Sequence, residues 1–590
     1  MCHEPRMILH FVTSAAHEDP ERCHTFRRCA LWFSSTIMPT ASGAWGLIVI
    51  RLNDRVAAIL LWSVIAAAVT ILALALPPRS FFSGDSGVKL IVARNAIQHP
   101  ARPIDVDLPR IDGQVAPFVD PFFVVHGDHS HAVTSDLFPV LSAPFIALLG
   151  IRGALVLPVA GFLATIWFTA ALGVALDHRR SRVWLIFVAV ACTPLFFYGL
   201  EFWEHAPAAA VAAVATTLYV KHRSPGMLAV SGALLGLAVL LRPEAVCYAV
   251  ALAVGSRWLR GRFIASEMAV VGAGALLMFL PFAALSAWTS GRLLGTIVSS
   301  DSCALLSAWW ANRWAYLGVW LLPPSNAWLA AFVVLAAAAV FASAVEDAHR
   351  KAIVRLAGVT FAAVIAFASS MGTFGRPSIW NAAPAVFAAF AAPLPHERRG
   401  GAFLWVVAGL SFALVTLIAP GDGGAQWGPR YATLSFIPLA ILIGDAFAAT
   451  MSGSRVVGTV AVAAALVLSL AVQRHAYRDL SGSKKMYERI VEFVERETPD
   501  GSVIVTDVWW FDQVTAGLYP TRHVLVADTT ESAARVSRML AATPRVYLVR
   551  SDTASSGEFP VRCDGMGLNP TRRARVGNPS LELVECSRTK

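Results

Sequence analysis

Three carboxylates stand beside long apolar stretches, where an unpaired charge is costly. Asp85 follows the first strongly apolar stretch in FFSGDSGVK, and Glu201 and Glu204 lie in EFWEH, between two later stretches. Ionisable groups at such positions tend to mark function, and a positioned carboxylate can take a proton from a hydroxyl. Alternatively, Asp85 caps the helix after it, and the glutamates are solvated beside an interfacial Trp203. These acids are candidates for catalysis or for metal binding.

Cationic side chains occur at similar places and suggest an anionic ligand. Arg242 ends an apolar run in LLRPEA, and Arg430 opens another in QWGPRY. An arginine at a helix terminus can hold a phosphate through charge-assisted hydrogen bonds. Lys89 and Arg376 are weaker candidates of the same kind. Alternatively, Arg242 pairs with Glu244, and Arg430 extends to the membrane interface.

The loop that carries Asp85 has further features. HGDHSH, from His126 to His131, holds three histidines and an aspartate. That set could bind a metal, but its Gly-Asp pair favours a tight turn in a polar loop. Gly84 and Gly87, on either side of Asp85, are expected to let the backbone approach a substrate closely. The apolar stretch 137–149 is predicted to lie along the membrane interface.

The composition places these residues in an integral membrane protein. Of 590 residues, 56% are hydrophobic and 15% are charged, whereas a soluble domain is about 25% charged. The mean hydropathy is +0.60. Apolar stretches of roughly 18 residues or more recur, each long enough to cross a bilayer as a helix. We predict an α-helical polytopic protein with about 13 transmembrane helices, from Val56–Leu76 to Val456–Val472.

The distribution of basic residues predicts the orientation. Six short loops predicted to be inside carry fourteen Lys and Arg residues, and four predicted to be outside carry four. Basic loops remain in the cytoplasm. The net charge of +10 therefore indicates topology, and nucleic-acid binding is excluded because no basic surface is concentrated in one place. The predicted location is the plasma (inner) membrane.

We predict three regions. Residues 1–55 form a disordered cytoplasmic segment, residues 56–472 the transmembrane domain with a large first outer loop at 77–136, and residues 473–590 a soluble extracytoplasmic domain. In that domain, residues 484–501 are predicted to form an amphipathic helix. SVIVTD, HVLVAD and RVYLVR read as buried strands, with a helix between the last two, which is typical of a small α/β domain. Cys563 and Cys586 can form a disulfide if this domain is extracytoplasmic.

Together, these motifs resemble the GT-C superfamily of membrane glycosyltransferases, in particular the branch of the protein mannosyltransferases and aminoarabinose transferases. The resemblance covers roughly residues 56 to 450. It rests on the order of Asp85 after the first span, the acidic junction EFWEH, the helix end GLAVLLRPEA and the late QWGPRY. Their shared side of the membrane adds to it.

The resemblance implies a sugar transfer from a polyprenyl-phosphate donor to an envelope glycan, lipid or protein. Asp85 would be the general base, and Glu201 and Glu204 would orient the acceptor or, in some branches, hold a divalent metal. Arg242 and Arg430, with Lys89 and Arg376 as weaker candidates, would bind the carrier phosphate. Many relatives have a second acid after the first, whereas this chain has Ser86, so we expect no required cofactor, with a divalent metal as the alternative.

A transporter or flippase of lipid-linked substrates is the alternative function. Such proteins often have two similar halves with broken helices at the membrane midplane. The sequence shows no such repeat, and its charged candidates cluster at the outer ends of the helices. The transferase is therefore the favoured hypothesis.

Overall fold

The computed structural model describes most of the chain from Asn53 onward. The described ranges are 53–107, 123–126, 129–290, 306–322, 327–369, 378–391, 399–421, 426–453, 455–519, 521–527, 529–551, 561–577 and 580–588, with Gly423 and four short strands. Those strands are β1 (Ile8–His10), β2 (Val49–Arg51), β3 (Arg110–Ile111) and β4 (Gln114–Val115). Most of the segment 1–55, predicted to be disordered, and the candidate Arg376 lie outside the described residues.

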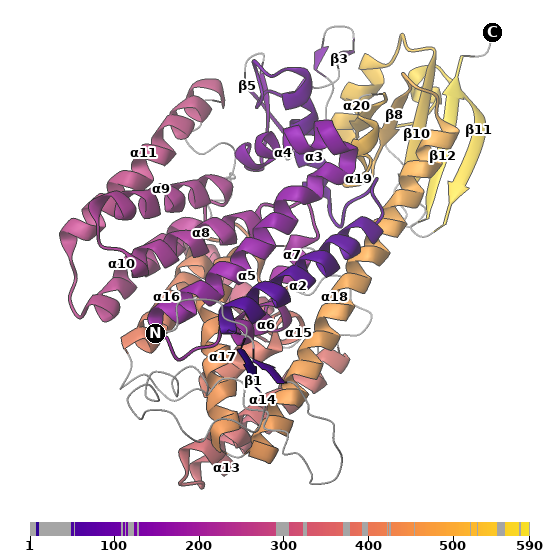
Figure 1. Ribbon diagram of the computed structural model, residues 1–590. Helices are drawn as coiled ribbons and strands as arrows, with labels where there is room; N and C mark the ends of the chain where they lie inside the picture. The colour runs from indigo at the N-terminus through magenta and orange to yellow at the C-terminus, as the bar shows by residue number, and fades with distance from the viewer. Residues whose placement is uncertain are drawn as a thin grey trace.

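Apolar helices form the body of the molecule (Figure 1). Within the described ranges, seven helices are long and apolar enough to cross a membrane, and three shorter helices are also apolar. The chain is therefore a multi-pass membrane protein, as predicted. The helical body as a whole contains α2 (Asp54–Ala75), α5 (Val156–Leu176), α6 (Arg182–Cys192), α7 (Leu195–Gly199), α8 (His205–Lys221), α9 (Pro225–Leu241), α10 (Ala245–Arg260), α11 (Ala265–Ser290), α12 (Leu306–Leu321), α13 (Ala327–Ser343), α14 (Ala348–Ser369), α15 (Ile379–Ala382), η3 (Pro384–Ala391), α16 (Arg399–Ile418), η4 (Arg430–Ser435) and α17 (Phe436–Gly453).

Every predicted span overlaps a helix, but several of these helices are shorter than the length needed to cross a bilayer. The span predicted at 381–392 is a short α-helix followed by the 3-10 helix η3. The number of about 13 crossings therefore stays a prediction, as does the orientation.

Small residues let neighbouring helices pack closely. A Cβ on Gly161 of α5 would lie 2.5 Å from the backbone nitrogen of Pro207 in α8. On α9, Gly232 and Gly236 approach the backbone of α11 in the same way. Such small-residue contacts are the usual means of helix association in lipid, where burial from water drives little.

The first loop folds over one end of this body. It contains α3 (Gly84–Gln98), the hairpin β5 (Phe123–His126) and β6 (His129–Ala132), α4 (Leu137–Leu149) and the 3-10 helix η1 (Gly150–Leu155). The hairpin pairs His126 with His129. The Gly-Asp pair between them, where a tight turn was expected, lies outside the described residues. The stretch 137–149 is helical, and several of its leucines are exposed.

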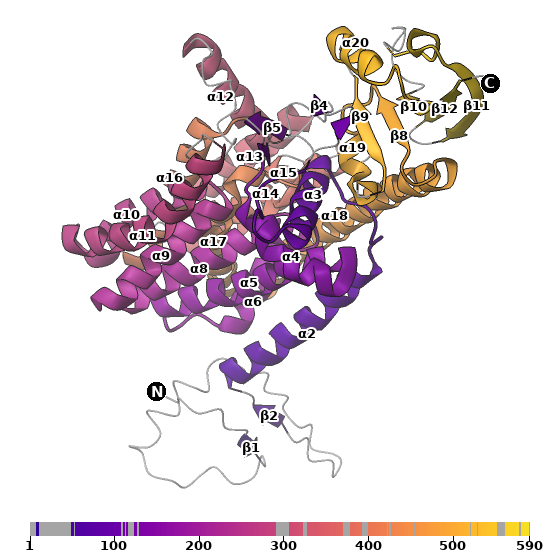
Figure 2. The same cartoon turned by 90° about the horizontal axis from the view of Figure 1, so that it is seen from above.

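One long helix, α18 (Arg455–Glu497), joins the apolar body to the C-terminal domain. The last predicted span and the predicted amphipathic helix are both parts of it, without a break at residue 472. Its 43 residues correspond to a length of about 65 Å. Figure 2 shows α18 leading from the apolar body to the C-terminal sheet.

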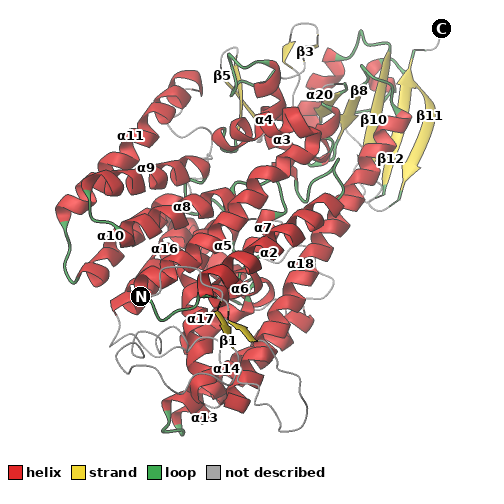
Figure 3. Ribbon diagram, viewed as in Figure 1, coloured by secondary structure: helices red, strands yellow, loops and turns green. Residues whose placement is uncertain are grey.

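The C-terminal domain contains a five-stranded mixed sheet of order β11-β12-β10-β8-β9 (Figure 3). The three predicted strands are β8 (Val503–Thr506), β9 (His523–Val526) and β10 (Arg545–Ser551), which are parallel to one another. The antiparallel strands β11 (Asn569–Val576) and β12 (Leu581–Ser587) were not predicted. The predicted helix is α20 (Thr530–Met539), which begins with a capping box.

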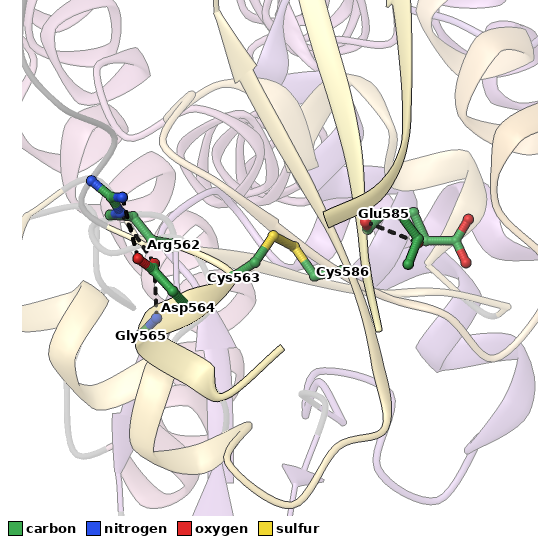
Figure 4. The surroundings of a disulfide bond; sticks show 7 residues. Arg562, Cys563, Asp564, Gly565, Glu585 and Cys586 are labelled. Atoms are coloured by element: carbon green, nitrogen blue, oxygen red, sulfur yellow. Dashed lines mark hydrogen bonds and ion pairs between the residues drawn. A yellow bond between two sulfur atoms is a disulfide. The ribbon is translucent and has the colours of Figure 1, made fainter. Parts of the chain in front are cut away.

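Two further features of this domain bear on function. Between β8 and β9, the chain forms the short helices α19 (Phe511–Val514) and η5 (Ala516–Leu518), which pack on α3. A disulfide joins Cys563 to Cys586 of β12 (Figure 4), as the sequence allowed.

Candidate functional site

Five separate chain segments bring acids and bases together at one end of the helical body. Most of these side chains lie at the end of a helix or in the loop beside it, whereas Lys89 lies within α3 and Lys484 within α18. The residues are Asp85 and Lys89 of α3, Glu201 and Glu204 between α7 and α8, Arg242 after α9, Arg430 at the start of η4, and Lys484 of α18.

Asp85 forms an ion pair with Arg430. Their Oδ2 and Nη1 atoms are 2.8 Å apart, and the side chains are 29% and 17% exposed. Ser83 occupies the cap position of α3, so the side chain of Asp85 contacts a distant cation instead of capping its own helix. Desolvation raises the pKa of Asp85, but attraction by Arg430 and then Lys89 outweighs it, and the pKa lies below its usual value. Asp85 is therefore a carboxylate at neutral pH, able to accept a proton.

Glu204 holds two cations in a buried network. Its Oε2 lies 2.8 Å from Nζ of Lys89, and its Oε1 accepts a hydrogen bond of 2.8 Å from Nη1 of Arg242. Arg242 also donates to Glu244, as the sequence suggested. Burial raises the pKa of Glu204, but Lys89 and Arg242 outweigh it and lower the pKa to about 2. Glu204 is thus a permanent anion whose charge is fully engaged.

Glu201 faces the segment that carries Asp85. Its side chain is fully buried, and its Oε1 accepts hydrogen bonds from the backbone N–H of Phe82 at 3.1 Å and the Ser86 hydroxyl at 2.6 Å. Its Oε2 lies 3.2 Å from Nζ of Lys484. Both carboxylate oxygens are therefore committed to protein groups, which favours a role in holding α3 over one in proton transfer.

The cations differ in how much hydrogen-bonding capacity they retain. Arg242 donates through all three of its nitrogens to Glu204 and Glu244, and Lys89 is buried against Glu204. Arg430 donates from Nη1 to Asp85 and from Nη2 to Tyr431, but its Nε has no partner within the described part of the chain. Arg430 is thus the cation best placed to take an additional anion.

Unfilled hydrogen-bonding groups lie beside Arg430. Its guanidinium carbon is 5.8 Å from the ring centre of Trp203. Nε1 of Trp203 and both ring nitrogens of His205 are buried without a partner among the described residues, and His205 stacks on Tyr198 with ring centres 4.7 Å apart. Buried polar groups normally bind a partner, and a ligand or water would supply one here.

The donor set favours anions over metals. Where side chains are described, no group of three His, Cys, Asp or Glu residues is arranged to hold a metal ion. The three site acids instead contact Lys or Arg side chains. Of the histidines and the aspartate of the HGDHSH motif, only His131 has a described side chain, and its Nε2 lies 3.6 Å from Oδ1 of Asp105.

Gly84 and Gly87 were expected to let the backbone approach a substrate, but the group that approaches them closely is Gln513 of α19. A Cβ on Gly84 would lie 1.4 Å from the side-chain oxygen of Gln513, and one on Gly87 would lie 1.7 Å from its backbone oxygen. Both glycines therefore allow α19 to pack on α3, and the close approach is to the C-terminal domain. Figures 1 and 2 both show α3 and α19 side by side.

Sequence reasoning missed Lys484. It stands among charged residues in KKMYERIVEF, a pattern typical of a solvated helix face, yet it is buried against the first loop. No local signal distinguishes it from Lys485. Arg376 lies outside the described residues, and its role as a phosphate ligand therefore stays a prediction.

Comparison with known proteins gives a likeness of fold. No protein-family model matches the sequence, and no curated protein matches it. ArnT from Cupriavidus metallidurans bound to undecaprenyl phosphate aligns with a TM-score of 0.51 and 11% identity, over 89% of this chain and 97% of ArnT. Its apo structure gives 0.50 and 11%, over 90% and 98%.

The archaeal oligosaccharyltransferase AglB from Archaeoglobus fulgidus aligns with a TM-score of 0.47 and 15% identity, over 84% of this chain and 69% of AglB. Over most of its length, the chain is thus structurally similar to ArnT, a GT-C membrane glycosyltransferase. The expected resemblance to this fold is confirmed.

Proposed function

We propose that this protein is a GT-C membrane glycosyltransferase that moves a sugar from a polyprenyl-phosphate carrier to an acceptor hydroxyl, with Asp85 as general base. The observation that carries the proposal is the Asp85–Arg430 pair. It joins a carboxylate to a cation with spare hydrogen-bonding capacity. The similar ArnT was crystallised with undecaprenyl phosphate, and this chain would take a carrier of the same class.

The reaction needs a base for the acceptor and a cation for the leaving group. The acceptor oxygen forms a bond to the anomeric carbon of the sugar, while the bond from that carbon to the phosphate oxygen breaks. The hydroxyl proton passes to the Asp85 carboxylate. The carrier phosphate leaves with additional negative charge, which Arg430 stabilises through charge-assisted hydrogen bonds.

The remaining charges prepare this site. Glu204 holds Lys89 and Arg242 in place, so that two more positive charges lie near the phosphate position without being its first ligands. Glu204 and Glu244 balance these two charges, so the stabilisation of the departing anion is assigned chiefly to Arg430. No metal is needed for these steps, because the site's own cations supply the charge stabilisation.

The proposed orientation follows the distribution of basic residues in the loops. It places the site and the C-terminal domain on the extracytoplasmic side of the inner membrane, where envelope glycans, lipids or proteins are the acceptors. A polyprenyl tail is apolar, so a carrier of this type would present its phosphate at the membrane surface, close to the ends of the helices that carry the site.

The test compares wild type with Asp85→Asn in isolated membranes supplied with radiolabelled polyprenyl-phosphate sugars and envelope acceptors. Asp107→Asn is the matched control, since Asp107 lies in the same loop with a side chain 57% exposed. We expect label transfer by wild type and the control and at least about a 100-fold loss in Asp85→Asn, because general base catalysis contributes factors of this order. Equal transfer by all three proteins at equal expression would refute the role of Asp85.

A further inference from the structure

Lys484 connects the C-terminal domain to the segment that carries Asp85. It lies on α18 and is 2% exposed. Its Nζ contacts Glu201 Oε2 at 3.2 Å and the backbone oxygen of Ser80 at 3.4 Å. In return, the Ser80 hydroxyl donates to the backbone oxygen of Lys484 at 2.6 Å, so side chain and main chain both take part.

Glu201 extends this connection to the residue after Asp85. Through its second oxygen, it accepts hydrogen bonds from Phe82 and from the hydroxyl of Ser86. An ionised carboxylate can accept several hydrogen bonds, whereas a protonated one must donate from one oxygen. Lys484 places the opposite charge beside the fully buried Glu201 side chain.

A second contact from the same domain flanks Asp85. Gln513 of α19 lies against Gly84 and Gly87, on the two sides of Asp85 in the sequence. The first turn of α3 is therefore held by α18 through Lys484 and Glu201, and by α19 through backbone packing. Both helices belong to the part of the chain that builds the C-terminal sheet.

We propose that Lys484 and Glu201 are positioning residues through which the C-terminal domain sets the Asp85 carboxylate against Arg430. This inference rests on the proposed function, because it assigns the pair a role in placing the general base. In this proposal, the C-terminal domain contributes directly to the geometry of the active site. The two EFWEH acids then have different roles, since Glu201 positions the base and Glu204 holds the cations.

The pair is tested with Lys484→Met, which removes the charge but keeps an unbranched side chain, and with Lys485→Met on the exposed neighbouring lysine as control. A misplacement of the base by about 1 Å can lower turnover by about 100-fold. We therefore expect kcat to fall by about that factor in Lys484→Met, with the KM for the donor changed less than about twofold, and no change in Lys485→Met.

The pH dependence distinguishes positioning from mere loss of folded protein. Arg430 holds the pKa of Asp85 down, so a displaced Asp85 becomes protonated at a higher pH. The acid limb of the kcat/KM profile, which reports the free enzyme in which Asp85 faces Arg430, should then move to higher pH in Lys484→Met. Loss of folded protein alone would scale the whole profile and leave that limb in place, which would overturn the proposal.

The double variant E201Q/K484M removes both buried charges together. The amide oxygen that replaces the Glu201 carboxylate can still accept the hydrogen bonds from Phe82 and Ser86, so kcat and the acid limb should return to within about tenfold of wild type. Failure of this rescue in protein that is present at wild-type levels would overturn the proposal. If Lys484→Met itself is absent from membranes, the profile of the double variant decides the question in the same way.

Failure of this inference differs from failure of the proposed function. If Asp85→Asn is inactive while Lys484→Met has the kcat and pH profile of wild type, the general base stands and the positioning role is wrong. If Asp85→Asn keeps full activity, the proposed function is itself wrong at this site.

Discussion

Replacing Glu204 with glutamine should destabilise the protein by about 3 kcal/mol, because it leaves two buried cations without their shared anion. Among the described residues, Glu204 is the acid within ion-pair distance of Lys89, whereas Arg242 keeps Glu244. Removing one partner from a buried pair typically costs about 3–5 kcal/mol. The pKa of Glu204 leads to a similar figure, since a decrease from 4.5 to about 2 corresponds to about 3 kcal/mol at neutral pH.

The assay is the free energy of unfolding in mixed micelles, measured by titration with a denaturing detergent and followed by tryptophan fluorescence. Glu495→Gln is the matched control. Glu495 forms an ion pair of 2.6 Å with Arg79, but the two side chains are 36% and 50% exposed. An exposed pair contributes about 0–1 kcal/mol, so the control should lose no more than that.

The pH dependence provides a sharper test of the same reasoning. The pKa of Glu204 is lower in the folded protein, so its stabilising contribution is complete above the unfolded value of 4.5 and is lost as pH falls through about 2. The difference between wild type and Glu204→Gln should therefore be constant from about pH 8 to about pH 6. A difference that shrinks over this range would mean that burial dominates the pKa of Glu204, and the proposed network would be refuted.

Three other predictions concern the site and the C-terminal domain. Gly87→Ala should push the C-terminal domain away, because the new Cβ would overlap the backbone oxygen of Gln513. Limited proteolysis should then cut this domain faster than in the control Gly482→Ala, whose new Cβ would meet open space. Equal rates of proteolysis would contradict the packing of α19 on α3. Arg430→Met should lower kcat by about 100-fold or more through loss of charge stabilisation, while an unchanged kcat would assign the phosphate to another cation. Cys563→Ser should lower the unfolding free energy of the C-terminal domain by about 3 kcal/mol, since the disulfide joins cysteines 23 residues apart, and reductant should affect wild type but not the variant.

The site residues predicted from sequence share one physical signal. A charged side chain at the end of an apolar helix is costly unless it has a partner, and Asp85, Glu204, Arg242 and Arg430 all have buried or partly buried partners. The sequence could not show which acid meets which cation. That choice depends on how helices far apart in the chain pack, as in the contact of Asp85 with Arg430.

Other features have no local signal. Lys484 is 404 residues from Ser80, and its burial depends on how α18 crosses the first loop. Strand β11, NPTRRARV, lies at the edge of the sheet with mostly exposed side chains, so it lacks the apolar alternation by which strands are recognised. The continuity of α18 was hidden by the polar segment SGS at 481–483, where Ser483 is buried against other parts of the protein.

The pairing of Asp85 with Arg430 bears on the order of events in the proposed reaction. Without donor, the base and the phosphate-binding cation neutralise each other, so a carrier phosphate must compete with Asp85 for the same guanidinium. Binding of the donor would release the carboxylate at the moment when the leaving group arrives, and an acceptor would be deprotonated only when a sugar is ready for transfer. It follows that Asp85→Asn should lower turnover yet bind the polyprenyl phosphate more tightly than wild type, because its amide competes less well for Arg430. Weaker binding of the carrier by this variant, measured by titration in detergent, would contradict this coupling.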